Sequence, residues 1–105
     1  MAGRKKDEAA LRKALIACAR RMNAIGLNHG RAGNVSLRSG EGLLITSSGM
    51  AYDDLKPVDI VWMDFDGKTR GARLPSSEWR FHCNILKARP QVNAIVHTHS
   101  VHATA

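Results

Sequence analysis

The sequence lacks a long apolar run, a low-complexity tract and an internal repeat. No hydrophobic stretch approaches the roughly 18 residues of a membrane-spanning helix. The first residues, Met1-Ala2-Gly3-Arg4-Lys5-Lys6, lead into charged residues rather than into the apolar centre of a signal peptide. We therefore predict a cytoplasmic protein with no membrane partner. The composition, 44% hydrophobic and 24% charged, is typical of a folded globular protein.

Cysteine and aromatic residues are also scarce. The 105 residues include two cysteines, two tryptophans, two phenylalanines and one tyrosine. Cys18 and Cys83 lie between apolar neighbours in helical patterns, which favours reduced packing residues over a disulfide framework. The aromatic residues are not interleaved with basic ones, as they are in surfaces that stack nucleic-acid bases, so we expect no nucleic-acid partner.

Acidic residues are fewer than basic ones, and the formal net charge is +7. Much of the excess lies along one predicted helix and the residues before it, at Arg4, Lys5, Lys6, Arg12, Lys13, Arg20 and Arg21. We interpret these residues as a solvated helix face. The positive charge would also favour the capture of a small anionic substrate.

A chain of this length forms one domain or part of one. Apolar residues at intervals of three and four predict a helix over 7–25, and a second helix is predicted from about residue 78 to 88, before Pro90. Short apolar or alternating stretches predict strands at 35–38, 43–46, 60–64 and 92–96. We therefore predict an α/β fold with a mostly antiparallel central sheet and helices packed on its faces.

Two histidines, His97 and His99, follow the apolar residues of the last predicted strand. Residues two apart on a strand project from the same face, so both imidazoles can reach one point. Neutral imidazoles are typical ligands of Zn²⁺, and a catalytic zinc ion usually has three protein ligands and one open position. A His-x-His pair by itself is more often one packed and one exposed histidine, so the residues upstream decide between the two interpretations.

Three short polar segments lie at junctions between predicted elements: Gly33-Asn34, Ser48-Gly49 and Ser76-Ser77. Glycine permits close approach of the backbone, the hydroxyls and the amide add donors, and the helix after Ser77 adds a favourable dipole. Together the segments could hold a phosphate. Each by itself is ordinary turn chemistry, or capping of the helix by a serine.

Glu78 lies in the first predicted turn of that helix. It either complements the helix dipole or acts as a general base that removes a proton α to a carbonyl, while a metal polarises that carbonyl and holds the resulting enediolate. The second possibility is aldol chemistry. We interpret His29, His82 and Tyr52 as packing or polar-contact residues rather than as metal ligands or a catalytic acid.

Four segments carry a family resemblance. They are Gly26-Leu27-Asn28 through Gly33-Asn34-Val35-Ser36, Leu44-Ile45-Thr46-Ser47-Ser48-Gly49, Leu74-Pro75-Ser76-Ser77-Glu78-Trp79-Arg80-Phe81-His82 and Val96-His97-Thr98-His99-Ser100-Val101-His102. In order and spacing they resemble the zinc-dependent class II aldolases of the fuculose-phosphate aldolase and adducin superfamily. The resemblance implies that Glu78 is the acid/base residue and that His97 and His99 bind zinc. It also implies a phosphate site made of Gly33, Asn34, Ser48, Gly49, Ser76 and Ser77.

The resemblance further implies a three-layer fold, of which residues 1–105 are the N-terminal portion of a single domain, and a homotetrameric parent enzyme. The implied reaction is reversible cleavage of L-fuculose 1-phosphate, or a related ketose 1-phosphate, into dihydroxyacetone phosphate and an aldehyde. The ribulose-phosphate 4-epimerase branch usually has aspartate and threonine after the paired serines. This chain has Glu78-Trp79 there, which favours an aldolase.

The family has a third zinc histidine and a tyrosine from a neighbouring subunit, both beyond residue 105, and we do not expect His102 to replace the third ligand. The 105-residue chain by itself is therefore expected to retain zinc poorly and to turn over little. Two alternatives stay open. One is an epimerase, decarboxylase or dehydratase on the same scaffold, and the other is a non-catalytic, adducin-like module.

Overall fold

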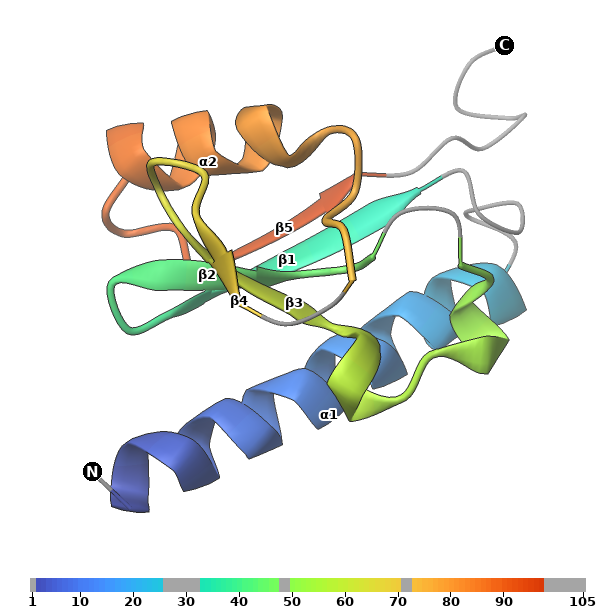
Figure 1. Ribbon diagram of the computed structural model, residues 1–105. Coiled ribbons are helices and arrows are strands. Elements are labelled where there is room, and N and C mark those ends of the chain that lie inside the picture. Colours follow the sequence, from blue (N-terminus) through green and yellow to red (C-terminus); the bar gives the residue numbers. More distant parts are fainter. Residues whose placement is uncertain (1, 26–32, 48–49, 71–72, 98–105) are drawn as a thin grey trace, which may run out of the picture.

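A computed structural model describes residues 2–25, 33–47, 50–70 and 73–97 (Figure 1). The helices are α1 (Ala2–Ala24) and α2 (Trp79–Ala88), with two short 3-10 turns, η1 (Tyr52–Asp54) and η2 (Pro57–Asp59). The strands are β1 (Asn34–Ser39), β2 (Gly42–Ile45), β3 (Val61–Asp64), β4 (Thr69–Arg70) and β5 (Ala94–His97). Among these residues no helix is long and apolar enough to cross a bilayer.

The strands form one sheet in the order β4-β3-β2-β1-β5, and every neighbouring pair is antiparallel. This arrangement confirms the predicted α/β fold with an antiparallel sheet. The sequence did not predict β4, because its two residues are both exposed and carry no apolar alternation. Helix α1 begins before the predicted start because Ala, Arg and Lys continue a helix readily without an apolar stripe.

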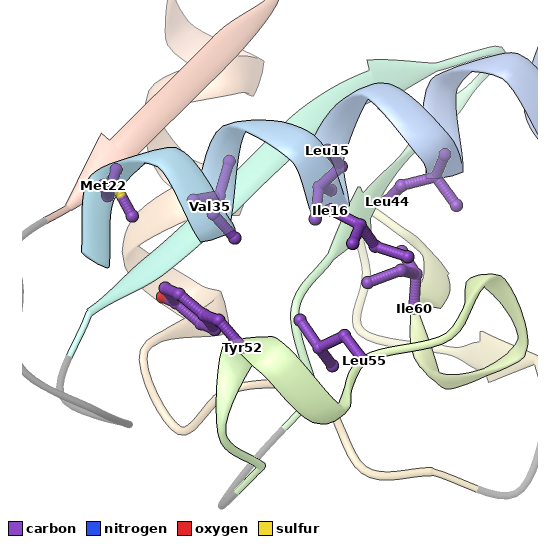
Figure 2. Close-up of a cluster of buried hydrophobic side chains, with 9 residues drawn as sticks. Leu15, Ile16, Met22, Val35, Leu44, Tyr52, Leu55 and Ile60 are labelled. Carbon is purple, nitrogen blue, oxygen red and sulfur yellow. The ribbon is translucent and has the colours of Figure 1, made fainter. Parts of the chain in front are cut away.

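The sheet is the middle of three layers, with α1 on one face and α2 on the other (Figure 1). The cluster between α1 and the sheet consists of Leu15, Ile16, Ala19, Met22, Val35, Leu44, Tyr52, Leu55 and Ile60 (Figure 2). The cluster between α2 and the sheet consists of Leu43, Ile45, Val61, Met63, Cys83, Leu86 and Ile95. Neighbours such as Leu43 and Leu44 belong to opposite clusters because side chains alternate across a strand.

Two arginines of α1 correct the prediction of a purely solvated basic face. Arg12 donates hydrogen bonds from Nη1 to the carbonyl oxygens of Pro57, at 2.7 Å, and Ile60. Arg20 donates from Nη2 to the carbonyl oxygen of Leu55 at 2.9 Å, and its guanidinium also reaches the carbonyl of Tyr52. Their long side chains satisfy carbonyl groups around η1 and η2, which is a structural role that a local charge pattern does not reveal.

Strand β1 holds both ends of α2. Near the carboxyl end of the helix, Arg38 donates from Nη2 to the carbonyl oxygens of Leu86, at 2.7 Å, and Val92, at 2.9 Å. Near the other end, the buried ring of His82 bonds to Ser36 Oγ through Nδ1, at 2.6 Å, and to Asn34 Oδ1 through Nε2. Helix α2 is therefore fixed to β1 by directional bonds as well as by its apolar face.

We predict that Leu44→Ala lowers the free energy of unfolding by about 2–5 kcal/mol, because it removes a fully buried side chain and leaves a cavity. The matched control is Leu74→Ala, since the Leu74 side chain is 75% exposed and should matter by less than about 0.5 kcal/mol. Urea unfolding of both variants gives the comparison. Equal losses would show that the α1 cluster is not assembled as described.

Burial also predicts a pH dependence of stability, because it lowers the pKa of His82 to about 4 from its ordinary value of 6.5. The unfolded chain then binds a proton that the folded protein rejects. The stabilisation is fully present above about pH 6.5 and falls by up to about 3 kcal/mol as the pH drops towards 4.

Urea unfolding between about pH 7 and pH 4, with a chelator present, measures this loss in the wild type and in His82→Gln, which has no titrating ring. We expect a clearly smaller loss in the variant. The pKa of Asp59 is lowered because its carboxylate accepts the Lys56 backbone N–H. Since the ordinary pKa of this group is 3.8, protonation of Asp59 affects the stability below the pH range of this experiment. Identical pH profiles of the two proteins would contradict the prediction.

Candidate active site

The candidate site lies where β1 begins, β5 ends and α2 begins (Figure 1). Asn34 and His97 are opposite each other in the antiparallel pairing of β1 with β5. Ile95 is buried in the α2 cluster, so His97, two residues later, projects from the same face of the sheet. Glu78 is the N-cap residue of α2, and α2 packs on that same face of the sheet.

Glu78 and His97 are in contact, through carboxylate Oε2 and ring Nδ1. Their side chains are 34% and 30% exposed, so the pair is packed on one side and accessible on the other. The Phe81 ring lies 5.5 Å from the His97 ring, centroid to centroid. The fold therefore brings the predicted acid/base residue to one of the predicted zinc ligands, although they are far apart in the sequence.

This contact bears on metal binding. A carboxylate at one ring nitrogen can orient a histidine that binds a metal ion through the other nitrogen. Imidazole and carboxylate are both donors that zinc accepts. His99 is outside the described ranges, and the residues within them include no group of three His, Cys, Asp or Glu that could hold a metal.

The predicted phosphate segments are drawn together by the buried residue Thr46 at the end of β2. Its N–H donates to the Val35 carbonyl at 3.1 Å, and its own carbonyl accepts the Ser76 N–H at 2.9 Å. Its hydroxyl accepts the Val35 N–H at 3.3 Å. Residues 34–35, 46–47 and 75–76 are therefore neighbours, whereas Ser48 and Gly49 lie outside the described residues. In the sequence, the signal for Thr46 is only its place between a strand and a polar loop.

The two segments that the structure describes differ in exposure. Gly33, Asn34 and Ser76 are buried, whereas Ser77 is exposed. The alternative in which a serine caps α2 does not hold, because the N-cap is Glu78 and it makes no side-chain capping bond. Ser76 lies in the preceding turn, where its hydroxyl accepts the Glu78 N–H at 3.4 Å and its carbonyl accepts the Trp79 N–H at 3.0 Å.

Two other residues behave as the sequence predicted. His82 packs between α2 and β1 and makes polar contacts there. Tyr52 is buried in the α1 cluster, and burial raises the pKa of its hydroxyl to about 12. The sequence argument missed Ser36, although it lies two residues after Asn34 and so on the same face of the strand. His29 and His102 are outside the described residues.

Residues 13–105 match the family described as Class II Aldolase and Adducin N-terminal domain. The 5-methylthioribulose-1-phosphate/5-deoxyribulose-1-phosphate aldolase of Rhodospirillum rubrum is 57% identical over 95 residues, 90% of this chain and 43% of that protein. The L-fuculose phosphate aldolase of Escherichia coli K12 is 51% identical over 84 residues, 80% of this chain and 39% of that protein.

A solved L-fuculose 1-phosphate aldolase has the same architecture, with a TM-score of 0.85 at 36% identity. The similarity covers 90% of this chain and 46% of that one, so the chain spans less than half the length of these relatives. The match over residues 13–105 and the shared three-layer fold confirm the resemblance found in the sequence. The chain belongs to the class II aldolase and adducin N-terminal domain family.

Proposed function

We propose that the protein is a zinc-dependent aldolase that cleaves a ketose 1-phosphate into dihydroxyacetone phosphate and an aldehyde. One observation carries the proposal: the Glu78 carboxylate contacts the His97 ring, and His97 is opposite Asn34 in the pairing of β1 with β5. Aldol chemistry needs a group that moves a proton at carbon next to a group that holds a metal. The family of the chain and the names of its relatives agree with this chemistry.

Glu78 is the proposed acid/base residue. In condensation, its carboxylate takes a proton from the hydroxymethyl carbon beside the carbonyl of dihydroxyacetone phosphate, and that carbon then bonds to the aldehyde. In cleavage, the Glu78 carboxylate takes the C4 hydroxyl proton as the C3–C4 bond of the ketose breaks and its electron pair passes to the enediolate. After the aldehyde has left, protonated Glu78 returns that proton to C3. Its position at the start of α2, partly exposed, lets the carboxylate reach a ligand from a rigid backbone.

His97 and His99 are the proposed zinc ligands. The Glu78 contact at Nδ1 supports His97 in this role, because a carboxylate at one ring nitrogen can orient a histidine that binds a metal through the other. His99 enters the proposal from the sequence alone. When bound, zinc would polarise the substrate carbonyl and offset the negative charge that develops on its oxygen.

The proposed phosphate site consists of Gly33, Asn34, Ser48, Gly49, Ser76 and Ser77. Two observations support it. The hydrogen bonds of Thr46 tie residues 34–35 to 75–76, and α2 begins at Trp79, two residues after Ser77. A helix N-terminus favours an anion, and the net positive charge favours its capture.

We also propose that the enzyme acts in the cytoplasm as a homotetramer. A family whose implied tyrosine comes from a neighbouring subunit needs such an assembly to complete its site. Light scattering coupled to size-exclusion chromatography measures the mass of the assembly, and a monomeric enzyme with full turnover would contradict this part of the proposal.

We predict that Glu78→Gln lowers kcat by about 10²–10⁴-fold, because an amide cannot accept or return the proton. The variant should still contain zinc. His97→Ala should instead lose most of the metal, because it removes a ligand. The control is Glu41→Gln, an exposed glutamate in the β1–β2 turn, which should change neither quantity.

Metal analysis after dialysis and a coupled assay of dihydroxyacetone phosphate measure both effects. Normal turnover in Glu78→Gln would exclude this residue as the acid/base group. Unchanged zinc content in His97→Ala would exclude His97 as a ligand.

The substrate prediction is a ketose 1-phosphate, because the named relatives share that class and differ only in the aldehyde half of the sugar. We expect dihydroxyacetone phosphate from L-fuculose 1-phosphate, 5-deoxyribulose 1-phosphate or 5-methylthioribulose 1-phosphate. The matched unphosphorylated ketoses should react at least about 100-fold more slowly, since the phosphate supplies remote binding energy.

Product analysis by mass spectrometry and NMR tests this choice of reaction. An epimer, carbon dioxide or a dehydrated sugar in place of dihydroxyacetone phosphate would identify another enzyme of the same scaffold. No conversion of any substrate by the zinc-loaded protein would favour a non-catalytic module.

A further inference from the structure

His82 is a fully buried histidine to which the proposed reaction gives no part. It lies four residues after Glu78 on α2, and its ring nitrogens bond to Asn34 and Ser36, both on β1. An apolar residue could fill the same space between a helix and a sheet. A polar ring with both nitrogens bonded to one strand points instead to a need for orientation.

The two bonds fix the state of the ring. Burial lowers the pKa of His82 to about 4, so at neutral pH the ring is neutral and has one N–H and one lone pair. Asn34 Oδ1 can only accept, so Nε2 must donate to it, and Nδ1 then accepts the Ser36 hydroxyl at 2.6 Å. The Ser36 hydroxyl can donate or accept, so it fits this tautomer by donating to Nδ1.

The same bonds fix the direction of the Asn34 amide. Because its oxygen is bound to His82, the NH₂ end is the part that can donate to a ligand. An ionised phosphate only accepts hydrogen bonds. An amide turned the other way would place its carbonyl oxygen against a phosphate oxygen, and neither of these atoms can donate. An asparagine without such an anchor can bind through either end.

We propose that His82 is a positioning residue for the substrate phosphate: by holding Asn34 Oδ1, it directs the Asn34 NH₂ group to the anion. The inference rests on the proposed function, in which Asn34 is part of the phosphate site. It adds a specific role to a residue that is neither a metal ligand nor a proton carrier. Because Asn34 is opposite His97 and His82 is one turn from Glu78, the same ring also sets the spacing of helix and strand at the site.

Two amide substitutions test the role. His82→Gln can place an NH₂ group where Nε2 was, and so can still donate to Asn34. His82→Asn is one methylene shorter and reaches only the place of Nδ1, near Ser36. Binding of inorganic phosphate to the purified protein is followed by ³¹P NMR, and kcat and KM are measured with the preferred ketose 1-phosphate.

We expect His82→Gln to keep phosphate affinity within about threefold of the wild type, and His82→Asn to weaken it by about tenfold or more, with the larger change in KM than in kcat. Equal phosphate affinities in the wild type and His82→Asn would overturn the inference while the proposed function stands. Failure of the wild type to bind phosphate would overturn both.

A measurement on the wild-type protein also tests the inference, and it does not depend on whether a variant folds. The ¹⁵N shifts of the His82 ring report which nitrogen carries the proton. A proton on Nε2, with slowed exchange of the Asn34 NH₂ protons on adding phosphate, supports the inference, and a proton on Nδ1 overturns it.

Discussion

A single buried imidazole joins helix α2 to strand β1, and the relative positions of Glu78, Asn34 and His97 depend on it. Apolar contacts such as those of Leu86 hold the helix to the sheet, but they have no preferred direction. Hydrogen bonds do have one, and His82 makes them through both ring nitrogens. Both partners, Asn34 and Ser36, are buried on the same strand. Their hydrogen bonds with the ring, rather than bonds to water, offset the free-energy cost of burying a polar ring.

Arg38 completes this attachment at the opposite end of the helix. The last carbonyl groups of a helix have no partner within it, and Arg38 donates to the Leu86 carbonyl and to Val92 in the connection to β5. Strand β1 therefore supplies a directional contact to each end of α2. A helix held in this way can present an N-terminal carboxylate at a constant position, which a group that moves a proton at carbon requires.

The loops of the site depend on a second buried residue, Thr46. Its backbone and hydroxyl serve Val35 and Ser76, which belong to separate parts of the chain. Loops rich in glycine and serine lose much conformational entropy when they become ordered. Hydrogen bonds that already hold such loops in the folded protein reduce the entropy that is lost when a ligand binds. The segments at Asn34 and Ser76 and the Glu78–His97 pair thus lie close together because β1 borders both β2 and β5.

The sequence by itself determined the periodic features: two amphipathic helices, the alternating strands, the reduced cysteines, and the candidate residues whose spacing resembles one family. Periodicity decides which residues of an element share a face, so neighbours such as Leu43 and Leu44 project from opposite faces of the strand. Only the tertiary structure decided that Arg12 and Arg20 bind backbone carbonyls, that Glu78 rather than a serine is the N-cap, and that Thr46, Ser36 and His82 organise the site. The partners of His82 lie 46 and 48 residues away, and a local pattern cannot encode a hydrogen bond whose two groups meet only when the sheet and helix have packed.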